Sequence, residues 1–518
     1  MSNKEYDVLI IGGGITGVGT ARDCAMRGLS TILVERRDLT NGATGRNHGL
    51  LHSGARYAVT DMASARECIE ENRILRHIAP NCIEETGGLF VSLPEDDPAY
   101  RKQLLDSCLA AGIDAEEIDP EEALLMEPSI NPGITGAIKV PDASVDPFRL
   151  TTANAIDATQ FGAEILTYHQ VTGFLLSSGR VVGVKAADLR TGETREIRAR
   201  ITVNAAGIWG SQIASLAGAD VRMLPSKGSL LIFGHRVAKM TVNRCRRPSN
   251  ADILVPGDVV SVLGTTSTKV PFSECDDLRV TPEEVSLLLE EGSKLAPVLS
   301  QTRVLRAFAG VRPLVASDDD SNGRNASRGI VLLDHGLRDD IPGFVSILGG
   351  KLTTYRRMAE IATDLVCEKL GINRVCHTAT MMLPGSGRIE EETGTPVSVK
   401  AAEGRHGTRV DKMDFSRKSE VLCGCEHVTR AEIAYAVKYL GVQNLIDLRR
   451  RTRVGMGTCQ GSSCLGKVAA ALAQELGCPE KTDELVRQYV QERWKGIAPI
   501  CWGEALREAE YMRKLYGE

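Results

Sequence analysis

The stretch that decides the fold is residues 7–17, DVLIIGGGITG. Its first five residues form a continuous apolar run, typical of a strand that is buried on both faces of a parallel sheet. A glycine turn and a helical pattern follow, and residues 30–35, STILVE, repeat the apolar run. The pattern predicts a β-α-β unit at the start of an α/β, Rossmann-type domain.

The turn carries the spacing G-x-G-x-x-G in Gly12, Gly14 and Gly17, and Glu35 ends the second predicted strand. Gly12 permits the tight turn, Gly14 lets backbone amides approach a pyrophosphate, and Gly17 lets the helix pack closely. Glu35 is placed to accept a hydrogen bond from a ribose 2′-OH and would repel a 2′-phosphate, which disfavours NADP. The motif alone does not separate NAD from FAD.

Composition excludes several classes of protein. The chain has 518 residues and a formal net charge of −5, which is enough length for two to four domains and too little positive charge for charge-driven nucleic-acid binding. The N-terminal sequence has no signal-peptide pattern, and no window of 18 residues is apolar enough to span a bilayer. We therefore expect a cytoplasmic protein whose 14 cysteines are reduced.

Four regions follow from the distribution of periodic segments. Residues 1–384 alternate helical and strand patterns, which indicates an α/β body with a second, mixed sheet. Residues 385–418 lack a clean period and are predicted to be a linker. Residues 419–475 form a small helical module that carries four cysteines in its loops, and residues 476–518 are predicted to be a helical C-terminal segment.

Three glycine-rich segments carry a resemblance to a known family. They are residues 43–57, ATGRNHGLLHSGARY, residues 203–209, VNAAGIW, and residues 349–355, GGKLTTY. Together with the opening turn, they resemble the FAD-dependent glycerol-3-phosphate dehydrogenases of the glycine/D-amino-acid oxidase superfamily. The resemblance implies FAD as the cofactor and oxidation of sn-glycerol 3-phosphate to dihydroxyacetone phosphate. In addition to Gly12, Gly14, Gly17 and Glu35, it implies cofactor contacts from Thr44, Gly45, Asn47, Ala206, Gly207, Gly350, Leu352 and Thr353.

A phosphorylated substrate needs cations, and an Arg fork binds phosphate at two points. The resemblance assigns substrate binding to Arg56, Tyr57, Arg312, Arg328 and Lys351. The candidate catalytic residues are Lys351, Arg312 and His52.

The sequence does not decide which residue accepts the proton of the substrate hydroxyl. Lys351 would serve if neighbouring cations lower its pKa, whereas His48 and His52 titrate near neutrality without such help. Aerobic relatives carry a His directly after Lys-Gly-Ser, where this chain has Leu230. A mechanism that depends on that His does not transfer to this chain.

Four cysteines form the pattern C-x-C…C-x4-C, in Cys423, Cys425, Cys459 and Cys464. This spacing favours a [2Fe–2S] cluster over zinc, and zinc over unliganded thiols. The basic run 449–453, RRRTR, is placed to offset the charge of a cluster, and no aromatic residue near it supports stacking on nucleic acid. The module resembles bacterioferritin-associated-ferredoxin-like [2Fe–2S] domains.

With this module, the resemblance narrows to the catalytic A subunits of the anaerobic branch of the family. It implies a B subunit, a membrane-bound iron–sulfur C subunit, and electron flow to the quinone pool from a peripheral position on the cytoplasmic face of the inner membrane. The sequence leaves open whether FMN is also bound in the complex. Two other readings stay open: an FAD/[2Fe–2S] dehydrogenase of an amino acid or 2-hydroxy acid, and a non-enzymatic electron-transfer or redox-sensing protein.

Overall fold

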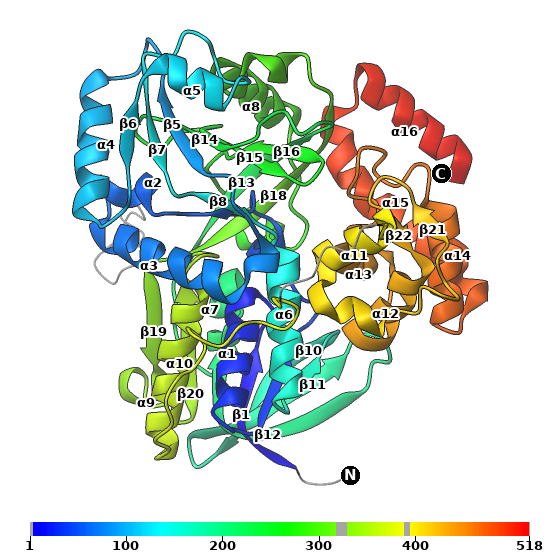
Figure 1. Ribbon diagram of the computed structural model, residues 1–518. Helices are drawn as coiled ribbons and strands as arrows, with labels where there is room; N and C mark the ends of the chain where they lie inside the picture. The colour runs from blue at the N-terminus through cyan, green and yellow to red at the C-terminus, as the bar shows by residue number, and fades with distance from the viewer. Residues whose placement is uncertain (1–3, 317–328, 388–393, 517–518) are drawn as a thin grey trace.

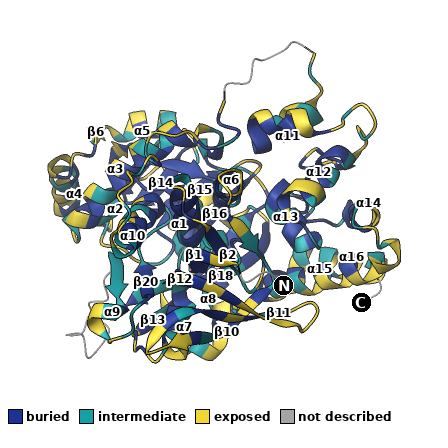
Figure 2. Ribbon diagram, turned by 90° about the horizontal axis from the view of Figure 1, so that it is seen from below, coloured by how far each residue is buried: buried dark blue, intermediate teal, exposed yellow. Residues whose placement is uncertain are grey.

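The computed structural model of this protein describes residues 4–316, 329–387 and 394–516. Figure 1 shows two sheet-based parts, coloured blue to green, and a C-terminal helical module, coloured yellow to red, at their side. Buried residues gather in the central strands and in the helix that follows the first strand, as Figure 2 shows.

The first sheet is built around the predicted β-α-β unit, which consists of β1 (Glu5–Ile11), α1 (Ile15–Met26) and β2 (Thr31–Val34). Strand β1 is parallel to β2 on one side and to β12 (Thr194–Asn204) on the other. The eight-stranded sheet runs β10 (His169–Ser177), β11 (Arg180–Asp188), β12, β1, β2 and β9 (Glu164–Leu166), with β20 (Phe344–Gly349) beside β12 and β19 (Ile330–Asp334) beside β20. Helices α6 (Pro147–Gln160) and α10 (Tyr355–Leu370) pack against α1. Alternate residues of β1 belong to two separate apolar clusters, which explains why the strand is apolar on both faces.

The second sheet is mixed, as predicted. Its nine strands include one parallel pair, β5 (Gly88–Ser92) with β14 (Thr241–Arg244), among antiparallel neighbours. The remaining strands are β6 (Glu116–Ile118), β7 (Gly136–Val140), β13 (Met223–Phe233), β15 (Ile253–Gly257), β16 (Val260–Gly264), β17 (Thr268–Lys269) and β18 (Val304–Val315). Helix α8 (Pro282–Leu295) packs against β13 and β16.

The cysteine module is a small helical unit with its own apolar core. It contains a short hairpin, β21 (Val421–Cys423) and β22 (Val428–Thr429), and the helices α12 (Arg430–Leu440), α13 (Leu445–Thr452), α14 (Leu465–Glu475), α15 (Thr482–Ile497) and α16 (Gly503–Tyr516). No helix in the described ranges combines the length and apolar character that crossing a lipid bilayer demands.

The stretch predicted to be a linker contains folded structure. Helix α11 (Val397–His406) lies within it, and Arg405 and His406 at its end pair with the buried Glu432 at 2.6 and 2.8 Å. The sequence pattern misses this helix because buried ion pairs with α12, rather than an apolar stripe, hold it in place. The Glu432 carboxylate is engaged by these two residues, while Thr429 caps α12 by accepting from the Glu432 amide at 3.2 Å.

The basic run at α13 docks the module on both sheet-based parts. Arg450 and Arg451 pair with the buried Asp38 at 3.1 and 2.5 Å, and Arg453 pairs with Asp258 at 2.8 Å. Asp38 and Asp258 lie outside the module, whereas Arg453 also pairs with Glu426 inside it at 3.1 Å. These three arginines therefore have carboxylate partners, and the interpretation that the run offsets the charge of a cluster stays a prediction. Ion pairs between segments far apart in the chain leave no local sequence signal.

Candidate functional site

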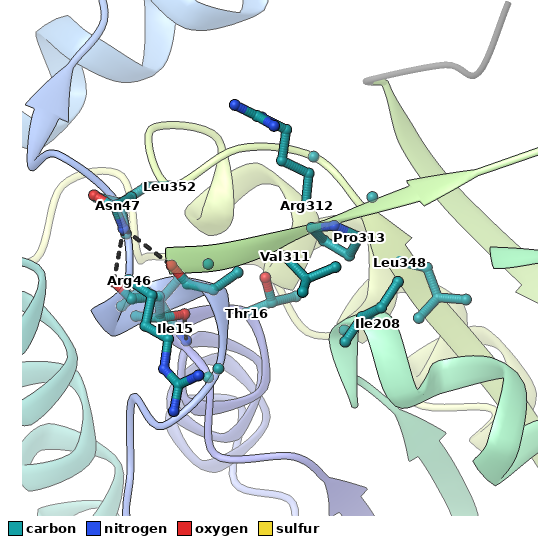
Figure 3. A pocket seen from close by; sticks show the side chains of 18 of the residues that line it. Ile15, Thr16, Arg46, Asn47, Ile208, Val311, Arg312, Pro313, Leu348 and Leu352 are labelled. Atoms are coloured by element: carbon teal, nitrogen blue, oxygen red, sulfur yellow. Dashed lines mark hydrogen bonds between the residues drawn. The ribbon is translucent and has the colours of Figure 1, made fainter. Parts of the chain in front are cut away.

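A large cavity opens at the carboxyl ends of β1 and β2, where ligands bind in open α/β sheets. Its volume is ≈ 970 Å³, and its lining extends from the glycine turn to β18 of the second sheet. Figure 3 shows Val311, Arg312 and Pro313 projecting from β18 on one side, with Ile15 and Thr16 of α1 below them. The cavity therefore joins the dinucleotide turn to the second sheet.

The glycines of the turn are required by space and by backbone conformation. Gly12 has φ of +116°, and a Cβ at this position would lie 2.5 Å from the Ala205 oxygen. A Cβ at Gly17 would lie 2.0 Å from the Gly12 oxygen. Gly14 lines the cavity at the start of α1, whose first turn carries no acidic residue. This end of α1 is therefore suited to an anionic pyrophosphate.

Glu35 lies at the end of β2 and accepts hydrogen bonds from the amides of Gly13 at 2.6 Å and Arg37 at 2.8 Å. Burial raises the pKa of this carboxyl. Both Glu35 and Gly13 are thus held at the mouth of the glycine turn, where the sequence predicts a ribose.

The loop 43–49 forms one wall of the cavity. Thr44 accepts from the Ile15 amide at 3.1 Å, and Asn47 donates to the Thr44 oxygen at 2.7 Å and accepts from the Gly49 amide at 2.8 Å. Ala206, Gly207, Gly350 and Leu352 line the same cavity. Gly45 lines a neighbouring cavity, and Thr353 is buried behind the wall, where its hydroxyl accepts from the His52 amide at 3.3 Å.

Three of the predicted cations reach the cavity together, namely Arg56, Arg312 and Lys351. Asp252 orients Arg56 through a pair of 3.0 Å, and the Thr266 oxygen accepts from Arg312 at 3.0 Å. The Lys351 ammonium donates to Ser64 at 2.9 Å and lies 4.7 Å from the centre of the Tyr57 ring, which also lines the cavity. Arg328, the fourth predicted cation, lies outside the described residues.

Two histidines stand beside these cations. The rings of His48 and His52 are 6.0 Å apart, and His52 is 5.4 Å from the Tyr57 ring. Burial, with the charges of Arg56 and Arg312, lowers the pKa of His48 to about 3. Its Nδ1 atom is buried and has no hydrogen-bond partner among the described residues. His48 is therefore a neutral imidazole with an acceptor or donor position to spare.

The four predicted cluster ligands come together on the loops of the helical module. Cys464 contacts Cys423 and Cys459, and Cys459 contacts Cys425. The hydrogen bond from the Cys464 thiol, followed by backbone amides, lowers the pKa of Cys459 and of Cys423. Among the described residues no set of three His, Cys, Asp or Glu side chains already has the geometry of a metal site. The four cysteines are free thiols, and each contacts at least one of the others.

Both donor sets fit the groups that the sequence implies. A Cβ at Gly12 or Gly17 would collide with neighbouring backbone, and the amides at the N-terminus of α1 are open. Both features suit a dinucleotide. Three of the four cysteines, Cys423, Cys425 and Cys459, receive backbone amide hydrogen bonds. Such bonds stabilise thiolate sulfur and suit an iron–sulfur cluster. Cys423 and Cys464 are buried, whereas Cys425 and Cys459 are partly exposed. One side of the cysteine site thus faces the surface.

Several residues that hold the site escaped the sequence analysis. Asp252, Thr266 and Ser64 position the three cations, and each lies far along the chain from its partner. An isolated acid or hydroxyl in a strand or helix has no motif around it. His48 differs from these three residues, because its place in the glycine-rich loop marks it in the sequence.

Comparisons with known families agree with both sites. Residues 7–356 match the family described as FAD dependent oxidoreductase, and residues 421–474 match the BFD-like [2Fe-2S] binding domain. The chain is 54% identical to the A subunit of the anaerobic glycerol-3-phosphate dehydrogenase of Haemophilus influenzae over 100% of this chain and 93% of that protein. It is 56% identical to the corresponding A subunit of Escherichia coli K12 over 99% of this chain and 96% of that protein.

Solved structures give the same result for the fold. The glycerol-3-phosphate dehydrogenase from Bacillus halodurans, complexed with FAD, is 26% identical and covers 97% of both chains with a TM-score of 0.73. The L-alpha-glycerophosphate oxidase from Mycoplasma pneumoniae, with FAD bound, is 22% identical and has a TM-score of 0.59 over 70% of this chain and 95% of that chain. The second likeness concerns the fold alone.

Proposed function

Since this chain belongs to the FAD-dependent oxidoreductase family, within the group of the anaerobic glycerol-3-phosphate dehydrogenase A subunits, we propose that it oxidises sn-glycerol 3-phosphate to dihydroxyacetone phosphate. One observation carries the proposal: a single cavity contains both the dinucleotide turn and the cations Arg56, Arg312 and Lys351. A phosphorylated alcohol bound by these cations lies in the same space as the cofactor.

The residues that would hold FAD are the glycine turn, Glu35, the loop 43–49 and the ends of β12 and β20. When bound, FAD supplies the acceptor for the hydride that leaves C2 of the substrate. The chain must bind the phosphate, orient C2 and remove the hydroxyl proton.

Arg56 and Arg312 are the phosphate ligands in this proposal. The Arg56 Nη1 atom is buried and has no hydrogen-bond partner among the described residues, while Asp252 holds its Nη2. A phosphate oxygen would complete the coordination of this guanidinium group. The position of Lys351, between Ser64 and the Tyr57 ring, directs its charge into the same cavity, where it would steady the developing alkoxide.

For the proton, we choose His48 from the three candidates that the sequence leaves open, His48, His52 and Lys351. In the free protein, burial and two neighbouring cations keep His48 neutral. Binding of a phosphate dianion neutralises Arg56 and Arg312, so the pKa of His48 rises when the substrate arrives. The imidazole then becomes a stronger base at the moment when a hydroxyl proton has to be removed. Since the His52 ring lies between those of His48 and Tyr57, it serves in this proposal to position them.

The four cysteines would hold a [2Fe–2S] cluster, which carries electrons one at a time. The proposal extends to a multi-subunit complex, because the relatives are themselves named as A subunits. In this proposal, a B subunit and a membrane-bound iron–sulfur C subunit receive the electrons and pass them to quinone as the final acceptor. The same partners attach the chain to the inner membrane. The partly exposed Cys425 and Cys459 support an exit for electrons on that side.

The test is an anaerobic titration of the purified protein followed by its flavin absorbance. We expect glycerol 3-phosphate to bleach the flavin and to reduce the cluster afterwards, whereas glycerol and lactate at the same concentration do neither. If lactate or an amino acid bleaches the flavin and glycerol 3-phosphate does not, the proposed substrate is wrong and the compound that bleaches takes its place. Iron and zinc analysis of the same sample separates a cluster from a zinc site.

A further inference from the structure

A second cavity lies between the two sheet-based parts and the cysteine module. Its volume is ≈ 580 Å³. Arg306 and Phe308 of β18 line it from the side of the second sheet, and Arg449 of α13 lines it from the module. Arg46 and His48 line both this space and the flavin cavity, so the loop 43–49 separates the two. We call this second space the interdomain cavity.

Two arginines of the interdomain cavity have no partner for their charge. The described residues provide no hydrogen bond and no ion pair for the side chains of Arg306 and Arg449, and the Nε atoms of both are buried. Arg306 is only 9% exposed. The neighbouring Arg450 and Arg451 behave differently, because both pair with Asp38. Arg46, which lines the same cavity from the loop 43–49, likewise has no side-chain hydrogen bond or ion pair among the described residues. Guanidinium groups from three separate segments therefore lack an acidic partner in this space.

The local charge balance is positive. Glu492 is the nearby acid that acts on both arginines, but Lys495 already binds it at 3.0 Å and also pairs with Asp277 at 2.8 Å. Burial, together with the charge of Arg449, lowers the pKa of Arg306 to about 9. Buried cations are normally paired, so this arrangement calls for an anion.

The cysteine thiolates are not that anion. The groups that act most strongly on Arg449 are Tyr489, Arg450 and Glu492, whereas Cys459 acts on Arg493 instead. Neither Arg306 nor Arg449 makes an ion pair or hydrogen bond with these cysteines among the described residues.

The rest of the wall is suited to an organic group. Phe148, Ile232, Val262 and Phe308 contribute apolar surface to a volume well beyond that of inorganic phosphate. Two guanidinium forks on opposite walls match the oxygens of a phosphate group, which accepts hydrogen bonds at two points from each fork.

We propose that the interdomain cavity is a binding site for an organic phosphate monoester, with Arg306 and Arg449 holding the phosphate and the apolar wall holding its organic part. The ligand lies next to the flavin cavity and against the cysteine module. Its source is either a phosphorylated cofactor that stays bound or a phosphorylated metabolite that exchanges freely, and the experiment distinguishes the two.

The experiment uses the purified holoprotein and the variants Arg449→Gln, Arg306→Met and, as a matched control, Arg247→Gln at an exposed arginine outside the cavity. Flavin and cluster absorbance report that each variant is folded; removing an unpaired buried cation is not expected to unfold the chain. Phosphorus analysis then measures phosphorus in excess of that of the bound FAD. Calorimetry measures the binding of phenyl phosphate and of inorganic phosphate.

A retained cofactor would appear as excess phosphorus in the wild type and the control, and be lost in the two cavity variants. An exchanging ligand would appear as binding of phenyl phosphate that weakens about tenfold or more in the cavity variants and not in the control. Inorganic phosphate should bind this site more weakly than phenyl phosphate, because it leaves the apolar wall empty. No excess phosphorus, together with identical phenyl phosphate titrations in all four proteins, overturns the proposal.

Discussion

Replacing Asp38 with asparagine tests whether the basic run of α13 docks the cysteine module. Asp38 is 2% exposed and pairs with Arg451 at 2.5 Å and with Arg450 at 3.1 Å. Removal of one member of a buried ion pair costs about 3–5 kcal/mol, because the remaining charges stay buried without compensation. Since asparagine keeps an oxygen that accepts a hydrogen bond, we expect a loss near the lower end, about 3 kcal/mol.

The loss should concern the module more than the flavin site. Chemical denaturation followed by the visible absorbance of the cluster should show a shifted midpoint in Asp38→Asn. Stopped-flow mixing with glycerol 3-phosphate should show flavin bleaching at its normal rate and slower reduction of the cluster, because the module is no longer held at a fixed distance. The matched control is Glu164→Gln, which removes an ion pair with Lys4 whose two side chains are about half exposed. Such a pair is worth about 0–1 kcal/mol.

Docking through Asp38 is excluded if Asp38→Asn costs no more than Glu164→Gln and leaves the rate of cluster reduction unchanged. The basic run would then be a solvated face that touches the sheet domain without holding it.

Four further predictions concern single residues. Arg56→Gln should lower kcat/KM for glycerol 3-phosphate about 10- to 100-fold, measured by anaerobic bleaching, because one charged hydrogen bond to phosphate is lost. His48→Gln should slow bleaching about 10²- to 10⁴-fold with little change in substrate affinity, and an unchanged rate would exclude His48 as the base. Cys459→Ser should remove iron while substrate still bleaches the flavin, whereas Cys478→Ser, outside the cysteine site, should retain iron. Burial raises the pKa of Asp447 to about 7, so the folded chain binds an extra proton between about pH 4 and 7. The wild type therefore loses stability as the pH rises through that window. Relative to the wild type, Asp447→Asn should gain stability from pH 4 to pH 8 in denaturation experiments.

The parts of the molecule that sequence predicts are those whose cause is local. Gly12 needs its positive φ within the turn itself, and a Cβ at Gly17 would collide with the backbone oxygen of Gly12, five residues earlier. Residues 8–11 of the first strand are all apolar because buried side chains cover both faces of its sheet. The cysteine site also has a local cause. Its four cysteines lie in two short loops, two in each, at the spacing that the sequence shows.

The parts that sequence does not predict depend on partners far along the chain. Asp38 and Arg451 are separated by 413 residues, and nothing near either residue marks the pair. Arg405 and His406 hold helix α11 in place through ion pairs with Glu432. Because these pairs, rather than an apolar stripe, fix the helix, its sequence pattern resembles that of a polar linker. The neutral state of His48 likewise follows from its burial and from Arg56 and Arg312, which only the folded chain brings beside it.

These long-range contacts bear directly on function, because the loop 43–49 faces two cavities. Arg46 and His48 line the flavin cavity on one side and the interdomain cavity on the other. The module contributes Arg449 and Met456 to the second cavity, and the pairs of Asp38 with Arg450 and Arg451 hold it there. The distance between the substrate site and the cysteines therefore depends on a buried ion pair that belongs to neither site. Since electron transfer between redox centres is sensitive to their separation, docking of the module is part of the machinery that turns alcohol oxidation into electron transfer.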